Sequence, residues 1–465
     1  MEICGKFPLF SFIVRLFSLY LRHIHDAMIE NTPKHNQKLL REAVKLIYDP
    51  ETALLMKKIN SSYLYWDKVK YMAPADVDPA VLWQAVKLQR IANAKAVTFG
   101  KYKFYFTVTE QMHAMLHEFD MNIGGSLGTN NLIPENDKNF YLVSSVMEEA
   151  IASSQMEGAS TTRKVAKDML RKNLKPRDKS QLMIANNYAT IRYLSEHRDD
   201  EFTVERLLDI HRYISAGTLE NKDDEGSIRQ TDDIVVMDGI TGDIAHTPPP
   251  HEEVAQLLEE LCTFANNDSP DDFIHPIIKG IILHFMLAYI HPFVDGNGRT
   301  ARSLVYWYMM KKGYWLTEYL SISRIIYTSK AKYERAFLYT EHDDNDLSYF
   351  IQFNLDTMKR AYEELKNYLQ RKINERDSIL MFKGVKGINQ RQAHILKIIT
   401  GKENEILTVK EVATRFNITG HTARTDLQGL VRQGLMDEIP LNNRLIGYVK
   451  SETYDEIIKH KIKGK

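Results

Sequence analysis

Residues 291–302 read HPFVDGNGRTAR and combine side chains that can do chemistry on a phosphate. His291 has an ordinary pKa near neutral pH, which suits removal of a proton from an attacking hydroxyl. Asp295 can supply the hard oxygen ligand that Mg²⁺ needs beside a polyphosphate. Arg299 and Arg302, three residues apart at the start of a helical pattern, can each bind phosphate oxygens through two parallel hydrogen bonds.

The segments on both sides of this motif explain how its side chains are positioned. The preceding run, IIKGIILHFMLAYI, is apolar all round, which predicts a helix buried in the centre of a bundle. The turn DGNG at 295–298 permits positive φ and leads into a second helical pattern, RTARSLVYWYMMKK. A glycine-rich turn before a helix N-terminus presents free N–H groups to phosphate oxygens. A turn or a cap would explain each feature alone, but together they indicate a phosphate-transfer site.

Most of the remaining chain has helical periodicity. The pattern at 142–173 contains Gly158 near its middle, which predicts a bend or a helix boundary there. Residues 230–247 contain two short β-type runs around DG and TG turns and predict a β-hairpin.

Residues 385–465 predict three helices and a short β ribbon, the parts of a winged helix-turn-helix domain. Its recognition helix is expected at Thr419–Leu430, with the following side chains exposed: His421, Arg424 and Thr425. The following are expected in its core: Leu427, Leu430 and Val431.

Composition limits the classes of function. The 465 residues allow two to four domains, and 61 basic residues balance 61 acidic ones, so any binding to nucleic acid must be local. The only two cysteines, Cys4 and Cys262, lie far apart, which argues against a disulfide framework or a zinc site and favours a reducing cytoplasm. The apolar stretch at 7–21 is interrupted by Arg15 and is shorter than the roughly 20 residues of a membrane span. Residues 1–27 are expected to be an amphipathic or disordered extension, or to precede a true start at Met28.

The motif closely resembles the signature of Fic-domain proteins at its histidine, phenylalanine, acidic, glycine, asparagine and arginine positions. The resemblance extends over about Phe106–Leu369 and includes the hairpin, the TPPP start of the next helix and SKAKYERAF. It implies a mainly α fold: a Fic-type helical bundle with a β-hairpin flap, plus the C-terminal winged helix-turn-helix domain. The expected parts are a helical N-terminal region at 28–105 and a core at 106–372, with an inhibitory helix at 142–173 and a flap at 230–247.

The resemblance also implies an activity, the transfer of AMP from ATP, with Mg²⁺, to a Ser, Thr or Tyr hydroxyl of a protein. His291 would be the base, Asp295 would hold Mg²⁺, and Phe293 would anchor the loop in the core. The nucleotide contacts, from anion hole to adenine, would be Asp295, Gly296, Asn297, Gly298, Arg299, Thr300, Ala301, Arg302, Ala245, His246 and Tyr333. Relatives often carry an asparagine near the adenine where this chain has Thr340, so that side of the pocket is less well defined.

A second motif, SSQMEG at 153–158, resembles the inhibitory motif of the family. Its spacing places Ser153 and Glu157 on one helix face, followed by Gly158. An isolated helical glutamate is usually a solvated surface residue. The resemblance implies that Glu157 instead pairs with Arg302, displaces the γ-phosphate of ATP and makes the wild-type protein a poor transferase.

The resemblance predicts a protein target that adds a strand to the flap. Self-modification, a homodimer, and contact of the winged helix with DNA or protein stay open, and no membrane partner is expected. Two other functions remain as alternatives: a DNA-binding regulator with a Fic-like sensor core, and an enzyme that removes AMP or transfers another phosphate-linked group.

Overall fold

In the computed structural model of this chain, the described residues are 29–124, 138–171, 173–237, 242–270, 272–383, 387–400, 405–416, 418–442 and 445–463. The expected extension at 1–27 and the tip of the expected flap at 238–241 lie outside them. None of the described helices is long and apolar enough to cross a bilayer.

The chain forms two compact units, residues 1–365 and 366–465, and helix α16 (Ser348–Lys383) runs from the first into the second. The described part of the first unit consists of helices, two antiparallel hairpins and their connections. The mainly α fold predicted from the sequence is thereby confirmed. The N-terminal region at 28–105 lies in the same unit as most of the expected core.

The described start of the first unit, from residue 29, contains four helices: α2 (Leu40–Tyr48), α3 (Pro50–Ser61), α4 (Trp66–Val69) and α5 (Pro79–Ala92). Helices α3 and α5 each begin with a proline, and the aspartate before it accepts a hydrogen bond from a first-turn N–H. Proline and aspartate are both favoured at these positions of a helix start. The helices share a core that includes Met56, Trp83 and Val86.

A β-hairpin follows α5, which corrects the expectation of a helical region up to residue 105. Its strands, β1 (Lys95–Phe99) and β2 (Tyr102–Phe106), pair in antiparallel register. Val97, Phe99, Phe104 and Phe106 are buried, because alternate side chains of a strand share one face. Gly100 takes a positive φ of 55° in the two-residue turn. The alternation was visible in KAVTFGKYKFYF, but the helical pattern before it was extended too far.

Helix α6 (Glu110–Phe119) continues into a π-helical turn at Asp120–Gly124. Further along the chain lie α7 (Lys138–Met156), α8 (Arg163–Arg171), α9 (Lys179–Glu196) and α10 (Val204–Ser215). The boundary predicted near Gly158 is confirmed, since α7 ends at Met156 and Gly158 has a φ of 90°. The N–H of Ala159 closes the end of α7 on the carbonyl of Ser154 at 3.0 Å. The expected inhibitory helix at 142–173 is therefore two helices, α7 and α8.

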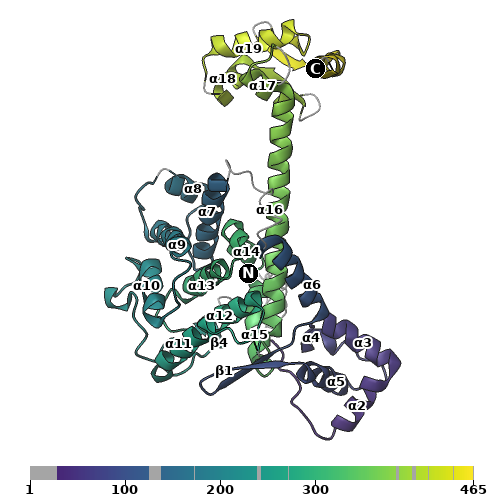
Figure 1. Cartoon of the computed structure of the whole chain (residues 1–465), viewed down its shortest axis with the longest axis vertical. Helices are drawn as coiled ribbons and strands as arrows, with labels where there is room; N and C mark the ends of the chain where they lie inside the picture. The colour runs from purple at the N-terminus through teal and green to yellow at the C-terminus, as the bar shows by residue number, and fades with distance from the viewer. Residues whose placement is uncertain are drawn as a thin grey trace, which may run out of the picture. The chain divides into compact units, whose positions relative to one another are not determined.

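The centre of the first unit is formed by α12 (Pro276–Ile290) and α13 (Asn297–Lys311), which pack side by side (Figure 1). Nearly every residue of α12 is buried, as its apolar sequence predicts. The remaining helices are α11 (His251–Asn266), α14 (Ile322–Thr328) and α15 (Lys330–His342), with short 3₁₀ turns at Lys222–Asp224 and Trp315–Tyr319.

The described part of the flap consists of two short strands, β3 (Val236–Met237) and β4 (Ile244–His246). Val236 pairs with His246 and Met237 with Ile244, so the register shifts at Ala245. Such a bulge re-aims neighbouring side chains.

Arg90 joins the N-terminal helices to the start of α16. It is 3% exposed and donates hydrogen bonds to Asn60 Oδ1 at 2.9 Å, the Leu64 carbonyl at 2.8 Å and the Tyr349 hydroxyl at 2.7 Å. Its guanidinium also lies 4.0 Å from the centroid of the Tyr63 ring. The N-terminal region is therefore tied to the helical core by a buried polar cluster.

The second unit contains α17 (Gln390–Thr400), β5 (Leu407–Thr408), α18 (Val409–Phe416), α19 (Gly420–Arg432), β6 (Met436–Asn442), β7 (Leu445–Lys450) and α20 (Tyr454–Lys463). The predicted winged helix is confirmed, with sheet order β5-β7-β6, and α20 is an addition that the sequence analysis missed. In α19, His421, Arg424 and Thr425 are exposed and Leu427 and Leu430 are buried, as predicted.

Asp426, on α19, provides a test of this unit. It is 3% exposed and accepts hydrogen bonds from Asn389 Nδ2 at 2.9 Å and Arg391 Nε at 2.7 Å. Asp426→Ala should lower the free energy of unfolding of the second unit by about 2 kcal/mol, because two donors lose a charged acceptor. All four tryptophans lie in the first unit, so their fluorescence in urea should not change while the far-UV circular dichroism does. Asp437→Ala, at an exposed position, is the control, and equal midpoints for both variants would contradict the prediction.

Candidate active site

His291 ends α12 and takes a left-handed conformation, with φ 48° and ψ 57°. Its Nδ1 lies 3.2 Å from the carbonyl oxygen of Ala288. Because a carbonyl only accepts, Nδ1 carries the proton and the lone pair of Nε2 is free to act as a base. Burial lowers the pKa of His291 to about 4, below the near-neutral value expected from the sequence. The ring is therefore neutral at pH 7.

The loop after His291 is held by Phe293 and Asn297. Phe293 is fully buried, as expected, and stacks on His211 with ring centroids 3.7 Å apart. Asn297 Oδ1 accepts from the N–H of Phe293 at 2.9 Å, and its Nδ2 donates to the Phe293 carbonyl at 2.8 Å. The side-chain amide of Asn297 thus closes the loop. Only the backbone N–H of Asn297 is left for the expected anion hole.

The start of α13 has the geometry expected of a phosphate nest. Gly296 is its N-cap with a φ of 86°, and the N–H groups of the first turn have no partner within an α-helix. Thr300 and Ala301 turn inward: the Thr300 hydroxyl donates to the Gly296 carbonyl at 2.9 Å, and Ala301 is fully buried. These two side chains therefore pack the helix and do not line the cavity described below.

Arg299 is fully buried and only partly hydrogen-bonded. Its Nη1 donates to the Ile214 carbonyl at 3.1 Å, and Nη2 lies 4.0 Å from Asp295 Oδ2. Nε and Nη2 have no hydrogen-bond partner, and burial lowers the pKa of the guanidinium. A buried cation with free donors is costly unless an anion binds to it, so Arg299 suits a phosphate ligand.

Arg302 makes the contact that the sequence analysis expected with Glu157. Its Nη2 donates to Glu157 Oε1 and to the Ser153 carbonyl, each at 2.9 Å, and its Nε donates to Ser153 Oγ at 2.9 Å. A Cβ at Gly298 would collide with Glu157 Oε1, so the carboxylate lies directly over the glycine of the nest. Gly158, at positive φ, ends α7 so that Glu157 is placed there.

Eight of the predicted site residues meet in a cavity of about 210 Å³. Of the predicted nucleotide and inhibitory residues, the following line it: Glu157, Ala245, His246, His291, Asn297, Gly298, Arg302 and Tyr333. The Tyr333 hydroxyl lies 2.9 Å from Nε2 of buried His284. Thr340 is buried and donates to the Ala336 carbonyl at 3.0 Å, and it is not part of the lining.

His246 fastens the flap to the helices beside the cavity. Its Nδ1 lies 2.8 Å from Glu341 Oε2 and its Nε2 lies 2.7 Å from the Tyr289 carbonyl oxygen. Both partners are acceptors, so both ring nitrogens must carry protons. Burial acts to lower the pKa of His246, but the hydrogen bond and charge of Glu341 outweigh it and the pKa is raised. The two acceptors and the raised pKa both favour the protonated form of His246 in the cavity wall.

Sequence reasoning missed the residues that hold the loop from outside. His211 donates from Nε2 to the Asp295 carbonyl at 2.8 Å and accepts from the Gly226 N–H at 3.0 Å. Arg229 donates to the His291 carbonyl at 3.0 Å. Both are far from the motif in sequence and lie in ordinary helical or loop patterns, so no local signal identifies them.

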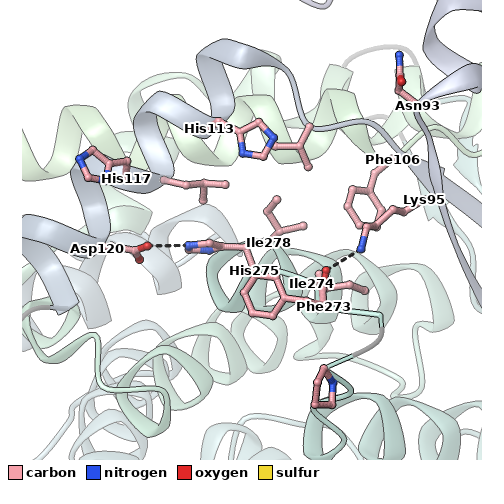
Figure 2. A pocket seen from close by; sticks show the side chains of 13 residues that line it. Asn93, Lys95, Phe106, His113, His117, Asp120, Phe273, Ile274, His275 and Ile278 are labelled. Carbon is pink, nitrogen blue, oxygen red and sulfur yellow. Dashed lines mark hydrogen bonds and ion pairs between the residues drawn. The ribbon is translucent and has the colours of Figure 1, made fainter.

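A larger cavity, of about 800 Å³, lies elsewhere in the first unit (Figure 2). His275 contacts Asp120 Oδ2 there at 3.1 Å, while its other nitrogen accepts from the Ile277 N–H at 3.2 Å. Since both nitrogens are engaged, His275 caps α12 and is not free to act as a base. This cavity contains none of the predicted site residues, so the smaller one is the candidate active site.

Asp295 fits the role of a ligand to Mg²⁺ beside a nucleotide. Its side chain is 51% exposed, and Oδ1 accepts from the Gly296 N–H at 2.6 Å. No group of three or more metal-binding side chains occurs among the described residues. Mg²⁺ at nucleotide sites is commonly bound by one or two carboxylates together with substrate phosphates, so a single aspartate is compatible with it.

Comparison with known proteins agrees with this geometry. The Fic/DOC family matches residues 201–309, and the DeoR-like helix-turn-helix domain matches residues 391–439. Protein adenylyltransferase fic-1 of Caenorhabditis elegans is 34% identical over 134 residues, 27% of this chain and 23% of that protein. Protein adenylyltransferase Fic of Nematostella vectensis is 32% identical over 119 residues, 25% of each. The chain thus matches about a quarter of the length of these relatives.

A solved structure of a Fic family protein from Desulfovibrio desulfuricans G20 has a TM-score of 0.47 and 18% identity, covering 73% of this chain and 94% of that chain. This superposition is too poor to add to the assignment, which depends on the matched segments and the motif. Residues 201–309 of this chain are a Fic/DOC domain, and residues 391–439 are a DeoR-like helix-turn-helix domain.

Proposed function

We propose that this protein is an adenylyltransferase that transfers AMP from ATP to a Ser, Thr or Tyr hydroxyl of a protein. The observation that carries the proposal is one cavity in which a neutral histidine with a free Nε2 lies beside Gly298 and Arg302. The names of the curated relatives support the same activity. Since the chain has only two cysteines, we place it in a reducing cytoplasm.

In the proposed reaction, Nε2 of His291 accepts the proton of the target hydroxyl as that oxygen attacks the α-phosphorus of ATP. A bond from the target oxygen to the α-phosphorus forms, the bond to the β-phosphate oxygen breaks, and pyrophosphate leaves. The first-turn N–H groups of α13 and the free donors of Arg299 hold the phosphate oxygens, and Asp295 would hold Mg²⁺ that neutralises their charge. Positioning and charge stabilisation supply most of the rate gain.

The flap is the proposed docking element for the target. Its two described strands pair only with each other among the described residues, so backbone groups remain for an added strand. β4 ends at His246, whose ring is fixed beside the cavity, so a strand on the flap would pass close to His291.

Glu157 is the proposed brake. Its carboxylate occupies Arg302 and covers Gly298, where a phosphate would otherwise lie. A nucleotide must displace this carboxylate or bind in a different pose. Wild-type protein should therefore transfer AMP slowly.

Glu157→Gly should raise the rate of self-modification with α-labelled ATP by about 10- to 100-fold. This factor corresponds to the ~1.5–3 kcal/mol of a charge-assisted hydrogen bond, here the one between Glu157 and Arg302 that ATP would no longer have to displace. Glu157→Gly/His291→Ala is the matched control, and it should lose about 10²–10⁴-fold in rate because the base is gone. A Glu157→Gly protein that binds ATP but is no faster than wild type would contradict the brake. Undiminished labelling in the double variant would contradict the base.

The pH dependence of Glu157→Gly tests the protonation state of the base. Burial lowers the pKa of His291 to about 4, so the ring is neutral above that pH and loses its lone pair below it. The value of kcat/KM for ATP, which reports the free enzyme, should be flat from about pH 5.5 to 8 and fall toward pH 4. ATP binding to the double variant, measured at the same pH values, distinguishes the effect of protonating ATP from the effect of protonating His291. An inflection near 6.5 that binding does not share would show an ordinary histidine.

Contact with DNA through the second unit is a second candidate function. It is favoured by the DeoR-like match and by His421, Arg424 and Thr425, which are exposed near the N-terminus of α19. In helix-turn-helix proteins this end of the recognition helix reaches base edges and the backbone in the major groove.

Gel retardation with fragmented genomic DNA at low salt tests this candidate. The chain should retard DNA, and Arg424→Ala should weaken binding and reduce the salt slope by about one unit if the guanidinium contacts a phosphate. Lys57→Ala, an exposed charge of the first unit, is the control. No retardation at low salt would leave the second unit a protein-docking or dimerisation domain.

A further inference from the structure

Arg229 lies between the flap and the catalytic loop and is 3% exposed. It belongs to neither the signature nor the inhibitory motif. Each of its three guanidinium nitrogens donates a hydrogen bond, and so does its backbone N–H. The acceptors lie in the catalytic loop or in the segments that flank the flap. A single buried cation therefore contacts both parts of the proposed site.

Toward the catalytic loop, Arg229 holds two consecutive peptides. Its N–H donates to the Pro292 carbonyl at 2.9 Å, and its Nε donates to the His291 carbonyl at 3.0 Å. His291 is in the left-handed region, which is unfavourable for a residue with a side chain and persists only where the surroundings enforce it. One of these two hydrogen bonds is made to the carbonyl of His291 itself and the other to the carbonyl of the next residue.

Toward the flap, Arg229 binds the segments that precede and follow the hairpin. Nη1 donates to the Thr231 carbonyl at 2.9 Å and to Asp232 Oδ1 at 3.1 Å, before β3. Nη2 donates to the Pro249 carbonyl, after β4. Asp232 Oδ1 also accepts from the N–H of His251 at 2.7 Å, so the first residue of α11 belongs to the same cluster.

The planar guanidinium fixes the distances between these acceptors. A lysine has one nitrogen on a flexible stem and cannot hold the carbonyls of His291 and Pro249 in a set geometry. We propose that Arg229 is a positioning residue that couples the flap to His291, so that the place of a docked target strand and the place of the base are set together. This rests on the proposed adenylyltransferase function and adds a residue through which target docking is linked to catalysis.

The coupling predicts a separation of kinetic effects. The hydrogen bonds of Arg229 do not involve Gly298, Arg299 or Arg302, so ATP binding should be little affected when Arg229 is replaced. The base and the flap should both lose their positions, so the turnover should fall. A residue that only stabilises the fold would not separate the two quantities.

The test uses the full chain in the Glu157→Gly background and compares it with Glu157→Gly/Arg229→Lys. Self-modification should lose about 100-fold in kcat, the order expected of a small misplacement of a reacting group. The calorimetric Kd for ATP should stay within about threefold, as for a change that acts after nucleotide binding. Amide hydrogen exchange, followed by mass spectrometry, should accelerate in peptides covering 229–237, 242–250 and 287–293, and not in α9.

Arg90→Lys in the same background is the matched control, since Arg90 is equally buried, binds three acceptors through its guanidinium and lies outside the site. It should lower the melting temperature without changing kcat. An equal loss of kcat in Arg90→Lys, an unchanged kcat in Arg229→Lys, or unchanged exchange in either the flap or the loop overturns the coupling. If Glu157→Gly binds ATP but transfers nothing, the proposed function fails, and the exchange measurement alone decides whether Arg229 couples flap and loop.

Discussion

The active site depends on the backbone conformation of one residue, His291. The buried helix α12 ends there, and the left-handed turn directs the chain into the loop that precedes α13. Nδ1 is held by the Ala288 carbonyl, which leaves Nε2 as the acceptor. Arg229 and His211 secure the carbonyls of His291 and Asp295 from outside the loop. A strained residue of this kind is stable only because rigid elements surround it on every side.

The second determinant is the competition for Arg302. Its guanidinium is engaged by Ser153 and Glu157 at the end of α7, so the position of that helix decides whether the arginine is free for phosphate. Helix α7 is itself anchored by buried Glu149, which accepts hydrogen bonds from the Tyr306 hydroxyl at 2.7 Å and the Ser323 N–H at 2.9 Å. The proposed brake therefore depends on the end of α7, where Ser153 and Glu157 both hold Arg302.

Much of the site could be predicted because its chemistry lies in a short segment. The run of apolar residues, the DGNG turn and the two arginines follow one another, so hydrophobic periodicity and turn chemistry place them correctly. Glu157 and Arg302 lie 145 residues apart in the sequence, so their pairing could be predicted only from the family resemblance. The hairpin after α5 was missed although its alternation is regular. His211, Arg229 and Glu341 were missed because nothing near them in sequence distinguishes them.

The sequence by itself determined which residues could act, that a buried helix precedes the motif and that a glycine turn precedes α13, since these features depend on neighbours along the chain. Only the tertiary structure decided their state. It lowered the pKa of His291, raised the pKa of His246, turned the Asn297 amide into the loop and placed Glu157 over Gly298. Desolvation and hydrogen-bond partners come from elements distant in sequence, so no local pattern contains them.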